Sequence, residues 1–148
     1  MYLRDICGRE EGAPPPVDLV EERENGDFVR ALILDGTLSA AHDLSDGGLL
    51  VALAEMCLAG GTGAEIALPE TGVASHAFLY GEDQARYLIA TDRADKLLTQ
   101  AHQADVPAVQ IGYSGGPSVI VKGVLSLPLS DIKAAHEAWL PAYMNAAE

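Results

Sequence analysis

The densest group of residues able to do chemistry lies between residues 42 and 48, where polar side chains precede two glycines. Carboxylates at this position could hold the Mg²⁺ that accompanies phosphates. Glycines let the backbone approach a ligand closely, and the start of a helix offers free N–H groups to an anion. The pattern therefore combines three requirements of phosphate chemistry. The group consists of His42, Asp43, Leu44, Ser45, Asp46, Gly47 and Gly48.

A purely structural interpretation of the same residues stays open on the pattern alone. Asp46 or Ser45 could cap the helix that follows, and Gly47 with Gly48 could serve a turn. A single histidine such as His42 is more often a structural residue than a ligand.

Composition limits the classes of function. The chain has 148 residues, is 49% hydrophobic and carries a net charge of −13 with only 9 basic residues. This balance argues against nucleic acid as a partner, because a phosphate backbone requires clustered Lys and Arg. The longest apolar run lies within residues 49–59, is too short to span a bilayer and contains Glu55. Cys7 and Cys57 lack metal-ligand or redox spacing, which favours a reducing, cytoplasmic compartment.

The sequence predicts an N-terminal connecting segment, or strap, followed by one domain. Residues 1–17 resemble a connection from an upstream domain, because three prolines at 14–16 favour extended geometry. The domain is expected over residues 18–148. A helix capped by Asp18 is expected to end near Asp35, with Leu19, Val20, Phe28, Val29, Leu32 and Ile33 on one face.

Helices and strands then alternate irregularly. Beyond a short strand entering residue 42 and a helix over 47–59, strands are predicted over 63–68, 78–80 and 85–91, and a helix over 92–103 that Asp92 caps. Strands over 109–112 and 118–121 are expected to flank a hairpin turn at Gly115 and Gly116. A final helix capped by Ser130 places Ile132, Ala135, Trp139 and Leu140 on one face. The order predicts an α+β fold, with helices covering a mixed sheet in α/β/α layers.

A second polar group occupies the turn before the strand at 85–91. Arg86 could bind a phosphate, or it could pair with Glu82 or Asp83 nearby. This group consists of Glu82, Asp83, Gln84 and Arg86.

With both groups in view, the chain resembles the AIR-synthase-related C-terminal domain family, as found in the synthetase subunit of phosphoribosylformylglycinamidine synthases. The resemblance extends over residues 1–91 and rests on the segments 8–19, 25–30, 42–49 and 81–86. It implies part of an ATP-dependent ligase of purine biosynthesis that converts formylglycinamide ribonucleotide to the amidine. The ammonia would come from a glutamine amidotransferase, with small accessory subunits as further partners.

The resemblance also implies roles for individual residues. Such synthetases are internally duplicated, and this chain matches the second C-terminal-type domain. Asp43 matches a metal-binding aspartate, and Glu82, Asp83 and Gln84 match a substrate-contacting turn. In the second half, an auxiliary nucleotide, ATP or ADP, with its Mg²⁺ often takes the corresponding position. Asp83 stands where the family usually has Ser, which adds negative charge. The nucleotide- or substrate-binding candidates are His42, Ser45, Gly47, Gly48, Glu82, Asp83, Gln84 and Arg86.

Two hypotheses of different class follow. In the first, the chain is a domain of an ATP-dependent carbon–nitrogen ligase. In the second, it is a nucleotide-stabilised scaffold module of the same synthetase, or the related domain of another enzyme of this superfamily. In either case the isolated chain is expected to be inactive. It is also expected to self-associate or to expose an apolar face, since the other domains of the synthetase would normally cover it.

Overall fold

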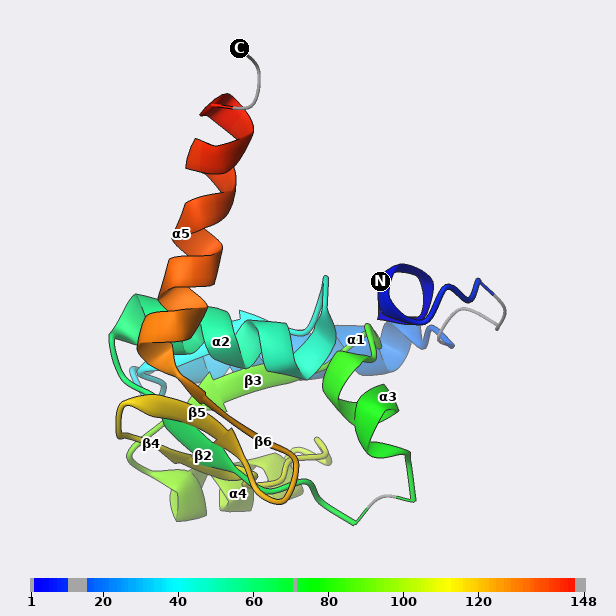
Figure 1. Ribbon diagram of the computed structural model, residues 1–148. Helices are drawn as coiled ribbons and strands as arrows, with labels where there is room; N and C mark the ends of the chain where they lie inside the picture. Colours follow the sequence, from blue (N-terminus) through cyan, green and yellow to red (C-terminus); the bar gives the residue numbers. More distant parts are fainter. Residues whose placement is uncertain (1, 11–15, 71, 146–148) are drawn as a thin grey trace. The chain divides into compact units, whose positions relative to one another are not determined.

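The computed structural model describes residues 2–10, 16–70 and 72–145, and it confirms an α+β fold. Predictions for Pro14 and Pro15 therefore lie outside the described residues. The elements are drawn in Figure 1. In chain order they are a π-helix Tyr2–Ile6, α1 Leu19–Leu34, β1 Ala40–Asp43, α2 Gly48–Gly60, β2 Ala64–Ile66, α3 Ser75–Tyr80, β3 Tyr87–Ala90, α4 Ala94–Gln103, β4 Gly112–Ser114, β5 Ser118–Val121, β6 Leu125–Pro128 and α5 Leu129–Asn145.

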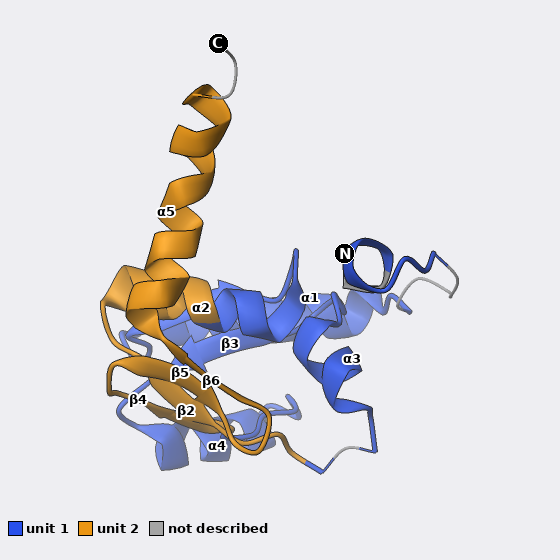
Figure 2. Ribbon diagram, in the orientation of Figure 1, with its two compact units in different colours: residues 1–53, 70–110 blue, residues 54–69, 111–148 orange. Residues whose placement is uncertain are grey.

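The chain divides into two compact units, each made of two separate stretches of sequence. Unit 1 contains residues 1–53 and 70–110, and unit 2 contains residues 54–69 and 111–148 (Figure 2). Helix α2 begins in unit 1 and ends in unit 2. Both polar groups singled out from the sequence lie in unit 1.

Unit 1 is built on an antiparallel pair of strands, β1 and β3, in which Ala40 faces Ala90 and Asp43 faces Tyr87. None of the residues in the two strands is fully buried, so helices supply most of the core. Burying these side chains stabilises the unit at about 25 cal/mol per Å² of apolar surface. The buried apolar residues of the unit are Val29, Leu32, Leu44, Leu49, Ala52, Leu53, Leu79, Leu97 and Ala101.

Helix α1 begins as its sequence predicts. The Asp18 carboxylate accepts hydrogen bonds from the N–H groups of Val20 and Glu21 at 2.9 and 3.1 Å, which satisfies two amides that have no partner inside the helix. The predicted apolar face was too wide, because only Val29 and Leu32 are buried. Leu19, Val20 and Ile33 are exposed. Helical spacing gives the direction of a face, whereas burial depends on how far the neighbouring elements reach.

Unit 2 contains the predicted mixed sheet, with strand order β4-β2-β5-β6. β2 runs antiparallel to β4 and parallel to β5, and β6 closes the sheet antiparallel to β5. One face is apolar because side chains alternate along a strand, so Ala64, Ile66, Val119 and Val121 are all buried. The strand β6 was not predicted from the sequence.

The hairpin predicted at Gly115 and Gly116 is wrong, because β4 and β5 do not pair with each other and instead lie on either side of β2. The Gly63 N–H donates to the Gly116 carbonyl at 2.8 Å, and the Gly115 N–H donates to the Gly63 carbonyl at 2.7 Å. The two glycines therefore carry the chain across the start of β2. A turn between two apolar runs shows that the chain reverses, but not whether a third strand lies between them.

Three further local predictions were wrong. Residues 78–80 form the end of helix α3 instead of a strand. α4 starts at Ala94, and Thr91 Oγ1 accepts the Arg93 N–H at 3.0 Å, so Asp92 is not the cap. α5 starts at Leu129, which places Ser130 inside the first turn, where its hydroxyl bonds to Asp131. Among the residues that the structure describes, no helix has both the length and the apolar character to cross a membrane.

Candidate functional site

The structure brings the two polar groups of the sequence together at one end of the β1–β3 pair. Asp43 ends β1 opposite Tyr87, which begins β3. The next amide, the N–H of Leu44, donates to the Arg86 carbonyl at 2.9 Å. Because Leu44 is buried, the turn that follows Asp43 is fixed against β3. Residues 42–47, at the end of β1 and in the turn after it, and the turn 81–86 therefore form one site, called here the paired-turn site.

A second hydrogen bond across this site joins Gly47 to Glu82. The N–H of Gly47 donates to Glu82 Oε1 at 3.0 Å, across 35 residues of sequence. A carboxylate is favoured here because the start of a helix carries partial positive charge. The sequence pattern suggested that amides at the start of this helix bind a phosphate. In this conformation the Gly47 N–H donates to the Glu82 carboxylate instead.

Gly47 and Gly48 are required by backbone geometry. Both have left-handed φ angles, +80° and +67°. A Cβ on Gly48 would lie 2.7 Å from the Gly81 carbonyl oxygen and 2.8 Å from the Tyr80 carbonyl carbon. The second glycine therefore lets the start of α2 pack directly on the backbone at the end of α3.

His42 and Asp43 form a local pair on β1. His42 Nδ1 lies 2.6 Å from the Asp43 carbonyl oxygen, so Nδ1 carries the proton and donates. The same nitrogen is 3.7 Å from Asp43 Oδ1. The Asp43 side chain is 66% exposed, which leaves its oxygens accessible from solvent. Its position at the end of a strand is the one that the sequence predicted.

Ser45 and Asp46 do not cap α2 with their side chains. In the described structure, no hydrogen bond joins either side chain to an amide of the helix, and both residues are exposed. The Ser45 carbonyl oxygen accepts the N–H of Gly48 at 3.0 Å. The structural interpretation of Asp46 is therefore wrong, because the left-handed glycines turn the backbone before the helix begins and Glu82 takes the amide of Gly47.

Arg86 is held by its own turn. Its guanidinium donates to Asp83 Oδ2 at 2.8 Å and to the Phe78 carbonyl at 3.4 Å, and it lies 4.9 Å from the centroid of the Phe78 ring. Of the two interpretations left open by the sequence, the structure shows the ion pair with Asp83. Such contacts fix the shape of the turn between α3 and β3.

The remaining turn residues are positioned by α1. Asn25 Nδ2 donates to the carbonyl of Ala85 at 3.0 Å, and Ala85 itself has a left-handed φ of 63°. Gln84 is exposed beside it. Sequence reasoning included Asn25 in a family-like segment but gave it no role in the site. The one signal in the sequence was that Asn25 is followed by Gly26 inside the predicted helix, which is an unusual place for both residues.

The charge of the paired-turn site is strongly acidic. It carries four carboxylates, on Asp43, Asp46, Glu82 and Asp83, and its own cation, Arg86, is paired with Asp83. No group of three or more His, Cys, Asp or Glu residues able to hold a metal ion occurs among the described residues. Asp43 can supply one carboxylate ligand to Mg²⁺. This fits Mg²⁺ only if its other ligands are water and phosphate oxygens, which is common for this ion.

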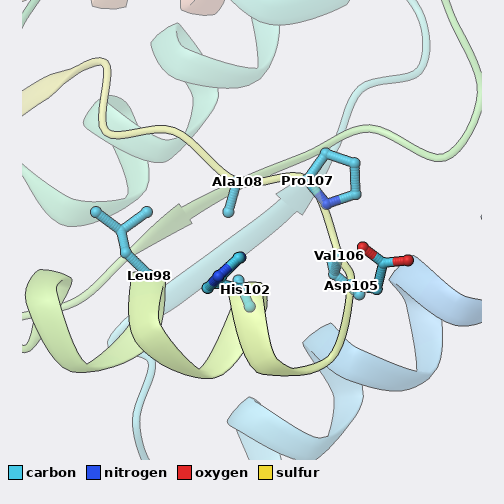
Figure 3. Close-up of a pocket in the computed structure, with 7 residues that line it drawn as sticks. Leu98, His102, Asp105, Val106, Pro107 and Ala108 are labelled. Carbon is cyan, nitrogen blue, oxygen red and sulfur yellow. The ribbon is translucent and has the colours of Figure 1, made fainter.

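A cavity of about 430 Å³ lies elsewhere in unit 1, beside the end of α4. Leu98 and His102 project from α4 toward Ala108 (Figure 3). None of the predicted site residues lines this cavity. The lining residues are Leu98, Ala101, His102, Asp105, Val106, Pro107 and Ala108.

Similar proteins are long synthetase chains. The chain is 54% identical over 149 residues to phosphoribosylformylglycinamidine synthase subunit PurL of Methylocella silvestris. It is 51% identical over 148 residues to the subunit of the same name from Rhodopseudomonas palustris strain BisA53. In both comparisons the match covers 99% of this chain and 20% of the relative. The chain therefore spans about one fifth of the length of these relatives.

Solved structures show the same fold at lower identity. PurL of T. maritima complexed with FGAR aligns with a TM-score of 0.70 and 20% identity, over 86% of this chain and 24% of that chain. The same protein complexed with ATP aligns with a TM-score of 0.63 and 20% identity, over 74% and 21%. A structure of PurLQS from Thermotoga maritima aligns with a TM-score of 0.66 and 20% identity, over 86% and 23%.

The family model named AIR synthase related protein, C-terminal domain, matches residues 1–122, which include both turns of the paired-turn site and strands β1 to β5. The match, together with the mixed sheet and the glycine turn, assigns the fold and the family. The chain belongs to the AIR synthase related protein, C-terminal domain, family.

Proposed function

We propose that this chain is a domain of an ATP-dependent ligase of purine biosynthesis, which converts formylglycinamide ribonucleotide to formylglycinamidine ribonucleotide. The relatives named phosphoribosylformylglycinamidine synthase subunit PurL, which are more than 50% identical over nearly the whole chain, support the proposal. The observation in the structure that carries it is the hydrogen bond from Gly47 to Glu82, which joins the two turns implied by the family resemblance.

In this proposal the paired-turn site contacts a nucleotide or the substrate. Asp43 supplies one oxygen ligand to Mg²⁺, and phosphate oxygens and water supply the others. When bound, Mg²⁺ neutralises phosphate charge that would otherwise be repelled by the four carboxylates of the site. Gly47 and Gly48 allow the backbone to approach the phosphates, and Arg86 holds the shape of the second turn. His42, Ser45, Glu82, Asp83 and Gln84 are proposed as further contacts.

The scaffold hypothesis is the second candidate, and one observation favours it. The Gly47 amide is already bonded to Glu82, and the guanidinium of Arg86 to Asp83, so both groups best suited to phosphate are used within the fold. Contacts of this kind stabilise the fold, which suits a scaffold module more than a site that must bind and release a substrate. ATP or ADP with Mg²⁺ is the proposed resident group.

The proposed assembly is larger than this chain. The remaining domains of the synthetase are proposed as covalent partners, since the relatives are about five times as long. A glutamine amidotransferase subunit and a small accessory subunit are proposed as separate partners in the cytoplasm. The solved PurLQS structure of a structural neighbour supports this part of the proposal.

A chimera tests the function. The matching fifth of the Methylocella silvestris subunit is replaced by this chain, and the chimera is expressed in a strain that lacks the subunit and requires purine. The expected result is growth without purine, and ATP- and glutamine-dependent formation of the amidine by the purified assembly. The matched control replaces the same fifth with that of the Rhodopseudomonas palustris relative, which is 51% identical to this chain. Rescue by the control but not by an equally expressed chimera of this chain would contradict the proposal.

A further inference from the structure

Helix α5 exposes four large apolar side chains near its end. It runs from Leu129 to Asn145 and has no buried residue. Trp139 and Leu140 are 66% and 58% exposed, and Tyr143 and Met144 are 63% and 65% exposed. The rings of Trp139 and Tyr143 stack with centroids 5.3 Å apart, so the two largest side chains form one aromatic surface. Monomeric proteins rarely expose such surfaces without a partner.

The chemistry of α5 changes along its length. Its first half carries Asp131, Lys133 and Glu137, of which the last two form an i,i+4 pair. Residues 138–144 carry no charged side chain, and their only polar side-chain groups are the Trp139 indole N–H and the Tyr143 hydroxyl. At 3.6 residues per turn, seven residues pass around the helix about twice, so this half is apolar on every side. A helix that is apolar all round is typical of an enclosed position.

Pro141 gives a second reason why the end of α5 requires a partner. Proline has no N–H, so the carbonyl of Glu137 receives no hydrogen bond from position 141. Proline inside a helix is unfavourable, and short helices are marginal in water without packing. No side chain of α5 is buried, so within the described structure only the Trp139–Tyr143 stacking and the Lys133–Glu137 pair offset this cost.

The properties of the chain argue against a second copy as the occupant. Two copies side by side would cover one side of each helix and leave the others in water. Each copy also carries a net charge of −13, which opposes close association. A standard stable interface takes about 800 Å² and about 20–30 residues from each partner, which is many more residues than a two-turn segment contains.

The family model and the long relatives differ in whether their matches include α5. The family model ends at residue 122, so β6 and α5 lie outside the shared domain. The long relatives nevertheless match 99% of this chain, so they retain the region of α5. The long relatives therefore retain the residues of α5, although the family model does not match them.

We propose that residues 138–145 of α5 insert into an apolar groove on the part of the synthetase polypeptide that lies outside this chain. The proposal rests on the proposed function, because it takes the complete synthetase as the protein that supplies the groove. The segment acts as a helix-in-groove anchor, with Trp139, Leu140, Tyr143 and Met144 as the inserted side chains.

Hydrogen exchange read by mass spectrometry tests this anchor in the Methylocella silvestris chimera described above. Peptides over 138–145 are expected to exchange at least about tenfold more slowly in the chimera than in the 148-residue chain. Leu140→Ser and Tyr143→Ser in the chimera are expected to remove this protection. Tyr113→Ser, which changes another exposed aromatic residue in β4, is the matched control and is expected to leave it intact.

Three outcomes would overturn the anchor: equal exchange in the two proteins, equal loss in the control, or protection in the chain alone that grows with its concentration. The last would assign the surface to a second copy. The matching peptides of the unaltered Methylocella silvestris subunit provide the same measurement if the chimera does not fold, and exposure there also overturns the anchor. Purine rescue without protection would reject only the anchor, whereas protection without rescue would reject only the proposed function.

Discussion

Asp43 and Asp46 lie three residues apart in the same polar group but have different surroundings. Asp43 ends a strand and has His42 beside it, with its carboxylate open to solvent. Asp46 lies in the turn and makes no side-chain hydrogen bond among the described residues. The two carboxylates carry the same charge near the same glycines. Comparing substitutions at the two positions therefore distinguishes a metal ligand from a general effect of charge.

Replacing Asp43 by Asn in the chimera should weaken the binding of Mg²⁺-nucleotide about tenfold or more, because a neutral amide is a poor ligand for a hard cation. The unfolding temperature without nucleotide should change little, since Asp43 is exposed. Calorimetric titration with Mg²⁺-ATP and Mg²⁺-ADP measures the first effect, and thermal unfolding measures the second. Asp46→Asn removes the same charge and should leave binding unchanged. Equal affinity of both variants and the parent would remove Asp43 from the metal site.

At the residue scale the sequence predicted types of residue better than their contacts. The requirement for glycine at 47 and 48 follows from the Asp-Gly-Gly pattern before a helix, and both φ angles confirm it. The bond between Gly47 and Glu82 joins residues 35 apart, and no local pattern encodes such a distance. The sequence left two interpretations of Arg86 open, and the structure shows the pair with Asp83, with the guanidinium also lying over the Phe78 ring.

Among the elements, the start of α2 is defined by close packing. Gly48→Ala should destabilise unit 1 by about 3 kcal/mol or more, because the new Cβ meets backbone atoms of residues 80 and 81 that cannot rotate away. Gly36→Ala is the matched control, since Gly36 also has a left-handed φ, +70°, but has open space around its Cβ position. Its cost should be about 1–2 kcal/mol, the strain of a left-handed residue alone. Urea unfolding of both variants compares them, and equal losses would show that packing at Gly48 is unimportant.

The start of α1 depends on a side-chain cap, whereas the start of α2 does not. Asp18→Ala should cost about 0.5–2 kcal/mol, because two amides lose their acceptor. Asp46→Ala should cost less than about 0.5 kcal/mol, as is usual for an exposed residue without such a bond. The free energies of unfolding of the two variants, measured side by side in urea, decide between these roles. A larger loss for Asp46→Ala would restore the cap that the sequence suggested.

Elements with strong local signals were predicted well, and those set by long-range contacts were not. α1, with its Asp18 cap, and α2 after its glycines follow from local spacing. Residues 78–80 are apolar and aromatic, which suggested a strand, yet they complete a helix whose Leu79 is buried in the core. The position of β2 between β4 and β5 required knowledge of pairing over roughly 50 residues of sequence, which the apolar runs themselves do not contain.

For the whole molecule, the proposed function predicts that the isolated chain does not make the amidine. It spans about one fifth of its relatives, and its described residues contain no three-ligand metal group. The purified 148-residue chain, supplied with ATP, Mg²⁺, ammonia and formylglycinamide ribonucleotide, should give no turnover above a blank without protein. The chimera, assayed under the same conditions, is the positive control. Turnover by the chain alone would show that the site is complete within it.

The division into two discontinuous units has a consequence for the order in which the protein is made. The polypeptide passes from one unit to the other after residues 53, 69 and 110, so neither unit is complete when its first stretch has been synthesised. β2 ends at Ile66, and its neighbours β4 and β5 begin at Gly112 and Ser118. At roughly 5–20 residues per second, a ribosome leaves β2 without either neighbour for several seconds. During that interval both of its hydrogen-bonding edges are open, and the nascent chain is most exposed to pairing with other chains while unit 1 is still being finished.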